Sequence, residues 1–227
     1  MHNPKVLIAC EESQRVCTAF RECGIEAYSC DIQECSGGHP EWHIMGDCLP
    51  LLNGRCEFYT MDGTRHYIGR RWDALGAHPP CTFISNAGAC RLYPRKGEID
   101  MERYAKGLKA KEFFLRFLNA DCDYIYVENP RPSKVFEMPK ESQRIQPYDF
   151  HGEENPYTKL TYMWYKGFPP LIPVNPVTPI GPWVPSGTGR KDRSKYGAAK
   201  RGDDAKNRSK TPTGIAKAMA EQWGGLL

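Results

Sequence analysis

The stretch Lys5-Val6-Leu7-Ile8-Ala9-Cys10 decides the fold, because it predicts a short buried strand that is apolar on both faces. Apolar residues at helical spacing follow it (Val16, Ala19 and Phe20), and Gly24 ends this predicted helix. A second strand is predicted over residues 25–30 and ends at Asp31. A strand–helix–strand unit predicts a parallel sheet and therefore an α/β fold.

The rest of the chain extends this pattern. A weak strand is predicted over 72–77, a helix over 101–118 and a strand over 124–127. The helix carries an apolar stripe (Met101, Tyr104, Leu108, Phe114, Leu115, Phe117 and Leu118). Seven prolines between Pro169 and Pro185 predict loop or extended chain, and a short helix follows, marked by Ile215, Met219 and Trp223. We therefore divide the chain into a core (1–167), a proline-rich and basic extension (168–211) and a C-terminal helix that packs on the core (212–227).

Length and charge suit one domain with a polyanionic partner. The 227 residues are enough for one well-buried core, and the formal net charge is +4. Residues 190–210 hold nine Lys or Arg residues against three Asp residues. A basic segment on a nearly neutral body favours a nucleic acid partner, although a solvated loop is the alternative.

Ten cysteines raise the question of the redox compartment. The N-terminal apolar run is too short for a signal peptide, and no stretch approaches the ~20 apolar residues of a membrane span. We therefore expect a cytoplasmic protein (in the host cytoplasm if a phage encodes it) without a membrane partner. Most of its thiols should be free.

Two features carry the candidate chemistry. In His78-Pro79-Pro80-Cys81 two prolines stiffen the loop that presents a thiol, and a thiolate can add to carbon 6 of cytosine. Glu128 follows the third predicted strand, and a carboxyl group can hold N3 of the ring while carbon 5 becomes nucleophilic. The alternatives are a packing role for Cys81 and a cap or ion pair for Glu128. Both residues follow strand ends, where open α/β sheets bind their ligands.

These motifs and their order resemble the cytosine-5 DNA methyltransferases, especially the short phage-type members. Pro79-Pro80-Cys81, with Ser85, is similar to the Pro-Cys motif of that family, and Glu128-Asn129-Pro130 is similar to its Glu-Asn-Val motif. Residues 8–14, Asp31 and Gly46-Asp47 resemble its cofactor motifs, and residues 214–223 resemble its C-terminal helix. The resemblance covers residues 5–130 and resumes loosely at 141–166 and 211–224.

The resemblance implies a Rossmann-like fold with a mostly parallel sheet and S-adenosylmethionine as cofactor. It implies that Cys81 is the nucleophile, that Glu128 is the partner of N3 and that Asn129 braces the loop. Asp31 would bind the ribose hydroxyls and Asp47 the adenine amino group. The remaining cofactor contacts would come from Cys10, Glu11, Ser13, Ile32 and Pro80.

The sequence departs from the family at four places. Cys10-Glu11-Glu12-Ser13 stands where the family has a glycine-rich loop, and Thr82 replaces the glutamine that follows the cysteine. The arginine-bearing motif that braces the cytosine in the family has no clear counterpart, and Lys159 with Thr161, or Gln143 with Arg144, would take its place. Residues 165–213 are mostly proline-rich or basic where the family keeps a large target-recognition region.

We therefore expect methyl transfer from S-adenosylmethionine to carbon 5 of cytosine in DNA. The alternatives are the same chemistry on RNA or a free cytosine nucleotide, and a catalytically silent nucleic-acid-binding module. His78 is expected to form hydrogen bonds within its loop, and the aromatic residues of 157–168 to pack in a strand rather than stack on bases. Four residues have ligand-like spacing for zinc, but they match no standard module, and we predict no metal site (Cys30, Cys35, His39 and His43).

Overall fold

The computed structural model describes residues 3–89, 91–95, 97–183 and 209–227. Its centre is a seven-stranded sheet with the order β3-β2-β1-β6-β7-β10-β8. The strands are β1 (Lys5–Ala9), β2 (Glu26–Asp31), β3 (His43–Met45), β6 (Ala74–Ala77), β7 (Tyr124–Pro130), β8 (Gln143–Ile145) and β10 (Thr161–Lys166). The first five strands in this order are parallel, and β10 is antiparallel to both β7 and β8.

The four predicted strands of the parallel sheet are confirmed. β6 begins two residues later than predicted, at Ala74, and β7 extends beyond Val127 to Pro130. The extension exists because β10 pairs with the end of β7, where Met163 faces Glu128 across the ladder. Glu128 therefore lies inside a strand rather than just past its end. The mostly parallel sheet is consistent with a Rossmann-like methyltransferase fold.

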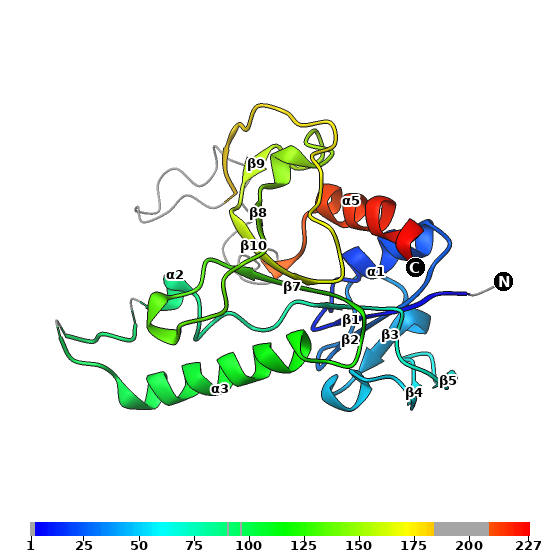
Figure 1. Ribbon diagram of the computed structural model, residues 1–227, viewed down its shortest axis with the longest axis horizontal. Helices are drawn as coiled ribbons and strands as arrows, with labels where there is room; N and C mark the ends of the chain where they lie inside the picture. Colours follow the sequence, from blue (N-terminus) through cyan, green and yellow to red (C-terminus); the bar gives the residue numbers. More distant parts are fainter. Residues whose placement is uncertain (1–2, 90, 96, 184–208) are drawn as a thin grey trace.

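Helices cover both faces of the sheet, as Figure 1 shows. α1 (Arg15–Glu22) and α5 (Thr213–Trp223) pack together on one face, and α3 (Met101–Leu118) lies on the other. Side chains of β1 alternate between these layers, so that Val6 and Ile8 join the α1–α5 core while Leu7 and Ala9 join the α3 core. The alternation explains why the whole strand is apolar.

The apolar stripe of α3 faces the core only in part. Phe114 and Phe117 are fully buried, and Phe114 meets Trp164 of β10 edge to face with 4.9 Å between ring centroids. Met101 and Leu108, by contrast, are 67% and 44% exposed. Phe114 and Phe117 therefore mark the face of the helix that packs on the core.

Several short elements were not predicted. They are β3 and β8 of the central sheet, α2 (Asn86–Ala89), the β4–β5 hairpin (Cys56–Tyr59 and Arg65–Ile68), the β9–β11 pair (Tyr157–Thr158 and Gly181–Pro182) and five 3-10 turns (Pro40–Trp42, Leu49–Leu51, Lys134–Phe136, Pro147–Asp149 and Gly224–Leu226). Most of the predicted basic segment lies outside the described residues, so the division of the chain at 167 and 211 stays a prediction. Within the described ranges, every helix is too short or too polar to cross a membrane.

Candidate active site

The candidate site lies where the order of the strands reverses. From β1 the chain moves outward to β2 and β3, and it then returns to the other side of β1 as β6 and β7. Open α/β sheets bind ligands at the carboxyl ends of the strands beside such a switch point. The backbone N–H of His78 donates to the carbonyl of Ala9 over 3.0 Å, so the loops after β1 and β6 lie side by side.

Hydrogen bonds join the loop that carries Cys81 to the loop that follows β7. The buried side chain of Asn129 donates to the carbonyl of Pro79 over 2.8 Å. Two backbone bonds continue this contact, from Asn86 to Arg131 and from Ser133 to Ile84. Asn129 and these backbone bonds therefore join the two loops, and the catalytic role of Asn129 stays a prediction.

A second anchor of the Cys81 loop comes from α3. The guanidinium of Arg103 donates to the carbonyls of Thr82 and Gly88 over 3.0 and 3.2 Å. The side chain of Asp100 caps the helix by accepting from the backbone N–H of Arg103. The capped first turn of α3 is thus a second anchor for the loop.

Glu128 is held by His78, a contact that was not predicted. Nδ1 of His78 donates to the Glu128 carboxylate over 2.8 Å, and the hydroxyl of Tyr126 lies 3.0 Å from Nε2. Burial acts to raise the pKa of Glu128, but the hydrogen bond and charge of His78 and the charge of Lys159 outweigh it. The pKa of this carboxyl group is therefore lower than usual, and its orientation is fixed.

Cys81 and Glu128 share this site. Burial, followed by the charge of Glu128, raises the pKa of the Cys81 thiol, while a hydrogen bond with Ser85 and the charge of Lys159 act to lower it. The net direction is upward, so the resting group is a neutral thiol. Any event that neutralises Glu128 makes the thiolate easier to form.

Of the two alternatives for the bracing cation, Lys159 is the one that the fold brings to this site. Burial lowers the pKa of Lys159, whereas the charges of Glu128 and Cys81 raise it. Gln143 instead donates to the carbonyl of Leu171, and Arg144 pairs with Glu141. The role of Lys159 stays a prediction.

The predicted cofactor residues lie at the carboxyl ends of the neighbouring strands. One oxygen of the Asp31 carboxylate accepts from the backbone N–H of Gln33, and Asp47 accepts from Leu49 in the same way. Ile32, beside Asp31, is 80% exposed, and Pro80 is exposed on the loop after β6. Oriented carboxylates beside an accessible apolar side chain fit the ribose and adenine of S-adenosylmethionine.

The loop from Cys10 to Gln14 replaces the glycine-rich loop of the family. Cys10 and Gln14 both adopt left-handed backbone conformations, with φ of 57° and 56°. The Glu11 carboxylate accepts from the N–H groups of Val16 and Cys17 and so caps α1. Burial raises the pKa of Glu11 to about 6. The carboxylate of Glu11 therefore has a structural task, and the cofactor contacts of Cys10, Glu11 and Ser13 stay predictions.

Three of the four residues with zinc-like spacing serve other contacts, and Cys35 is a free thiol. Both ring nitrogens of the buried His43 have protein partners, the hydroxyl of Ser29 at 2.8 Å and the carbonyl of Gln33 at 2.9 Å. His39 pairs with Glu41, and the thiol of Cys30 points to the carbonyl of Gly46. Among the described residues no three His, Cys, Asp or Glu side chains are placed to hold a metal, and the nine described cysteines are free thiols.

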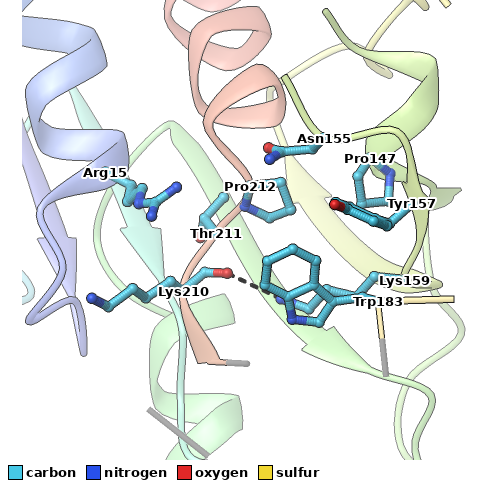
Figure 2. Close-up of a pocket in the computed structure, with 9 residues that line it drawn as sticks. All are labelled: Arg15, Pro147, Asn155, Tyr157, Lys159, Trp183, Lys210, Thr211 and Pro212. Atoms are coloured by element: carbon cyan, nitrogen blue, oxygen red, sulfur yellow. Dashed lines mark hydrogen bonds between the residues drawn. The ribbon is translucent and has the colours of Figure 1, made fainter. Parts of the chain in front are cut away.

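A pocket next to this site was not predicted. Figure 2 shows the residues that line it. Three of them are cationic, two are aromatic and one is a threonine (Arg15, Lys159, Lys210, Tyr157, Trp183 and Thr211). The hydroxyl of Thr211 also lies 3.4 Å from Nδ1 of His78. The lining comes from four distant segments without a common motif, so no local sequence pattern indicates it.

No family model matches the chain, and no curated protein matches it in sequence. Among solved structures, the methyltransferase EhMeth of Entamoeba histolytica is similar, with 11% sequence identity and a TM-score of 0.39. The match covers 83% of this chain, which spans only 62% of the length of that protein.

Proposed function

We propose that the protein transfers the methyl group of S-adenosylmethionine to carbon 5 of cytosine in DNA. The observation that supports this most directly is that Cys81 and Glu128 lie in one site, where the charge of Glu128 raises the pKa of the thiol. The resemblance of both motifs to the cytosine-5 DNA methyltransferases supports the choice of substrate. Within that site, a thiol and a carboxyl group are the two functions that attack on a cytosine ring requires.

The proposed reaction begins at the sulfur. The Cys81 thiol gives its proton to the Glu128 carboxylate as Sγ bonds to carbon 6; the π bond between carbons 5 and 6 breaks, and its electrons make carbon 5 nucleophilic. This proton neutralises Glu128 and so removes the charge that disfavours the thiolate; Glu128 passes the proton to N3 and takes it back when Cys81 leaves. After carbon 5 has taken the methyl group, a base removes the proton of carbon 5, the double bond re-forms and the Sγ–carbon 6 bond breaks.

S-adenosylmethionine would supply the electrophilic methyl group when it is bound. Asp31 and Asp47 would hold its ribose and adenine at the ends of β2 and β3. Cys81 lies on the loop after β6, on the other side of the switch point. The methyl donor and the target cytosine would therefore meet across the switch point. For duplex DNA the target base has to leave the stack to reach this position.

A trapping experiment tests the proposal. The chain is incubated with S-adenosylmethionine and a duplex that contains 5-fluorocytosine, and the products are separated under denaturing conditions. Because fluorine at carbon 5 blocks the final elimination, we expect a stable adduct with the wild type. Cys81→Ser should form none, whereas Cys56→Ser, which changes a half-buried thiol of the hairpin, should behave as the wild type.

The substrate class is tested in parallel. Methyl transfer is measured on duplex DNA, single-stranded DNA, RNA and deoxycytidine monophosphate. We expect the highest rate on DNA. An adduct that persists in Cys81→Ser, or methylation confined to RNA or the free nucleotide, would contradict the proposal.

A further inference from the structure

The pocket beside Lys159 is lined by three cations and two aromatic rings. Figure 2 shows the side chains of Arg15 and Lys210 on the left and those of Tyr157 and Trp183 on the right. Among the described residues, no Asp or Glu lines it. The positive charge is therefore not balanced by an acidic side chain in the pocket wall, which favours an anionic ligand.

The two aromatic rings form a fixed platform. β9 and β11 pair in parallel, with Tyr157 opposite Gly181. The backbone N–H of Trp183 donates to the carbonyl of Thr158 over 2.9 Å. The rings meet edge to face at 5.1 Å and 68°. Tyr157 does lie in a strand, as expected, but its ring lines the pocket. Backbone pairing thus positions both rings before any ligand arrives.

The pocket adjoins the candidate reaction centre without containing it. Lys159 lines the pocket, and its charge also acts on Cys81 and Glu128. Thr211 lines it too and lies 3.4 Å from His78, whereas Cys81 and Glu128 are not part of its wall. A ligand in the pocket would therefore sit next to the reacting base and would not replace it.

We propose that this pocket binds the nucleotide next to the target cytosine, with its phosphate at Arg15 and Lys210 and its base against Tyr157 and Trp183. Guanidinium and ammonium groups bind phosphate oxygens, and aromatic side chains stack on any base. This inference rests on the proposed function, because that function supplies the neighbouring target base.

Binding of a cytosine-free single strand tests the inference apart from the methyl transfer. The probe is a fluorescein-labelled thymidine octanucleotide, and its anisotropy is measured with the full chain at several salt concentrations. Trp183→Leu and Tyr157→Leu should each weaken binding by about 10-fold. Arg15→Gln and Lys210→Gln should each reduce the slope of log K against log salt by about 0.7, as expected for one lost phosphate contact to a single strand.

Matched controls change side chains of the same kind elsewhere. Tyr67→Leu in the hairpin and Lys109→Gln on α3 both alter exposed residues, and they should leave affinity and salt slope unchanged. Trp183→Phe should bind nearly as the wild type, because it keeps an aromatic ring. Thymidine monophosphate should compete with the probe and thymidine should not. This comparison shows whether the phosphate group is required for binding.

Three outcomes would overturn the inference. The first is that the wild-type chain does not bind the probe. The second is that the pocket variants have the melting temperature of the wild type and bind the probe equally well. The third is that thymidine competes as well as thymidine monophosphate. Because the probe has no cytosine and no cofactor is added, loss of methyl transfer leaves this result untouched. Conversely, adduct formation with unchanged octanucleotide binding in the pocket variants would support the proposed function and exclude this pocket.

Discussion

Nδ1 of His78 lies 2.8 Å from the carboxylate of Glu128, and the two side chains are only 9% and 10% exposed. They are 50 positions apart in the chain and meet because β6 and β7 are neighbouring parallel strands. A charge-assisted hydrogen bond of this kind fixes the direction of the carboxylate. His78 is thus a positioning residue for the group that we propose to hold N3.

Replacing His78 should raise the pKa of Glu128. In the wild type this pKa is depressed, so the pair stabilises the fold above the ordinary pKa of a glutamate, and the contribution is lost as the pH falls through the lowered pKa. In His78→Leu, burial raises the pKa of Glu128 with less opposition. The stability of this variant should therefore fall as the pH rises and the buried carboxyl group ionises. We expect a loss of about 3 kcal/mol at pH 7. Urea unfolding between pH 4 and 8 measures it.

The matched control for this prediction is His39→Leu. His39 forms an exposed pair with Glu41, at a similar distance of 3.0 Å. Its removal should change stability far less, because exposed ion pairs contribute little. Equal losses in the two variants would show that burial of the His78–Glu128 pair has no special effect.

Asn129→Ala should loosen the loop that presents Cys81. The substitution removes the hydrogen bond to Pro79 and leaves a buried carbonyl without this donor, which should cost about 1–3 kcal/mol of unfolding free energy. Because a small displacement of the nucleophile lowers the rate strongly, trapping by the 5-fluorocytosine duplex should slow by about 10-fold or more. Asn3→Ala, at an exposed site, is the control. A normal trapping rate in a destabilised Asn129→Ala would show that the bond serves stability alone.

Glu11 should make the protein less stable as the pH rises from 4.5 to above 6. Its pKa is raised by burial from 4.5 to about 6, so the folded state binds more protons than the unfolded state in this window. The expected loss across the window is about 2 kcal/mol. In Glu11→Gln this loss should be absent, whereas the exposed Glu57→Gln should retain it. A pH profile of Glu11→Gln that matches the wild type would assign the effect to another group.

Sequence patterns predicted the parts of the molecule that depend on local periodicity. β1, α1 and β2 follow from apolar spacing, and the position of Cys81 follows from the end of β6, whereas Glu128 lies inside β7. The contact of His78 with Glu128 was not predictable, because it depends on which strands are neighbours. The insertion of β10 between β7 and β8 depends on the same tertiary pairing.

The pocket was beyond prediction for a related reason. β9 and β11 have only two residues each, too few to show a period. Tyr157 and Trp183 meet through that pairing, while Arg15 comes from the start of α1 and Lys210 from the segment before α5. Likewise, the left-handed conformation of Cys10 fills a role that sequence reasoning assigns to glycine.

Gly76 should prove essential to the position of His78. A Cβ at Gly76 would overlap the ring and hydroxyl of Tyr126, which pairs with it across β6 and β7. That hydroxyl lies 3.0 Å from Nε2 of His78. Gly76→Ala should therefore displace the tyrosine and cost about 1–3 kcal/mol of unfolding free energy. Gly46→Ala is the control, because a Cβ there meets no atom within 4 Å.

A double-mutant cycle separates the ring from the strand backbone. If the cost of Gly76→Ala comes from overlap with Tyr126, it should shrink in a Tyr126→Leu background, with a coupling of about 1 kcal/mol or more. Tyr126→Phe keeps the ring and should lose only about 1 kcal/mol, while it removes the contact with His78. If the two losses of stability simply add, the cost of Gly76→Ala comes from contact of the new Cβ with the strand backbone. Tyr126 would then be positioned by the α1–α5 core, in which it packs against Trp223.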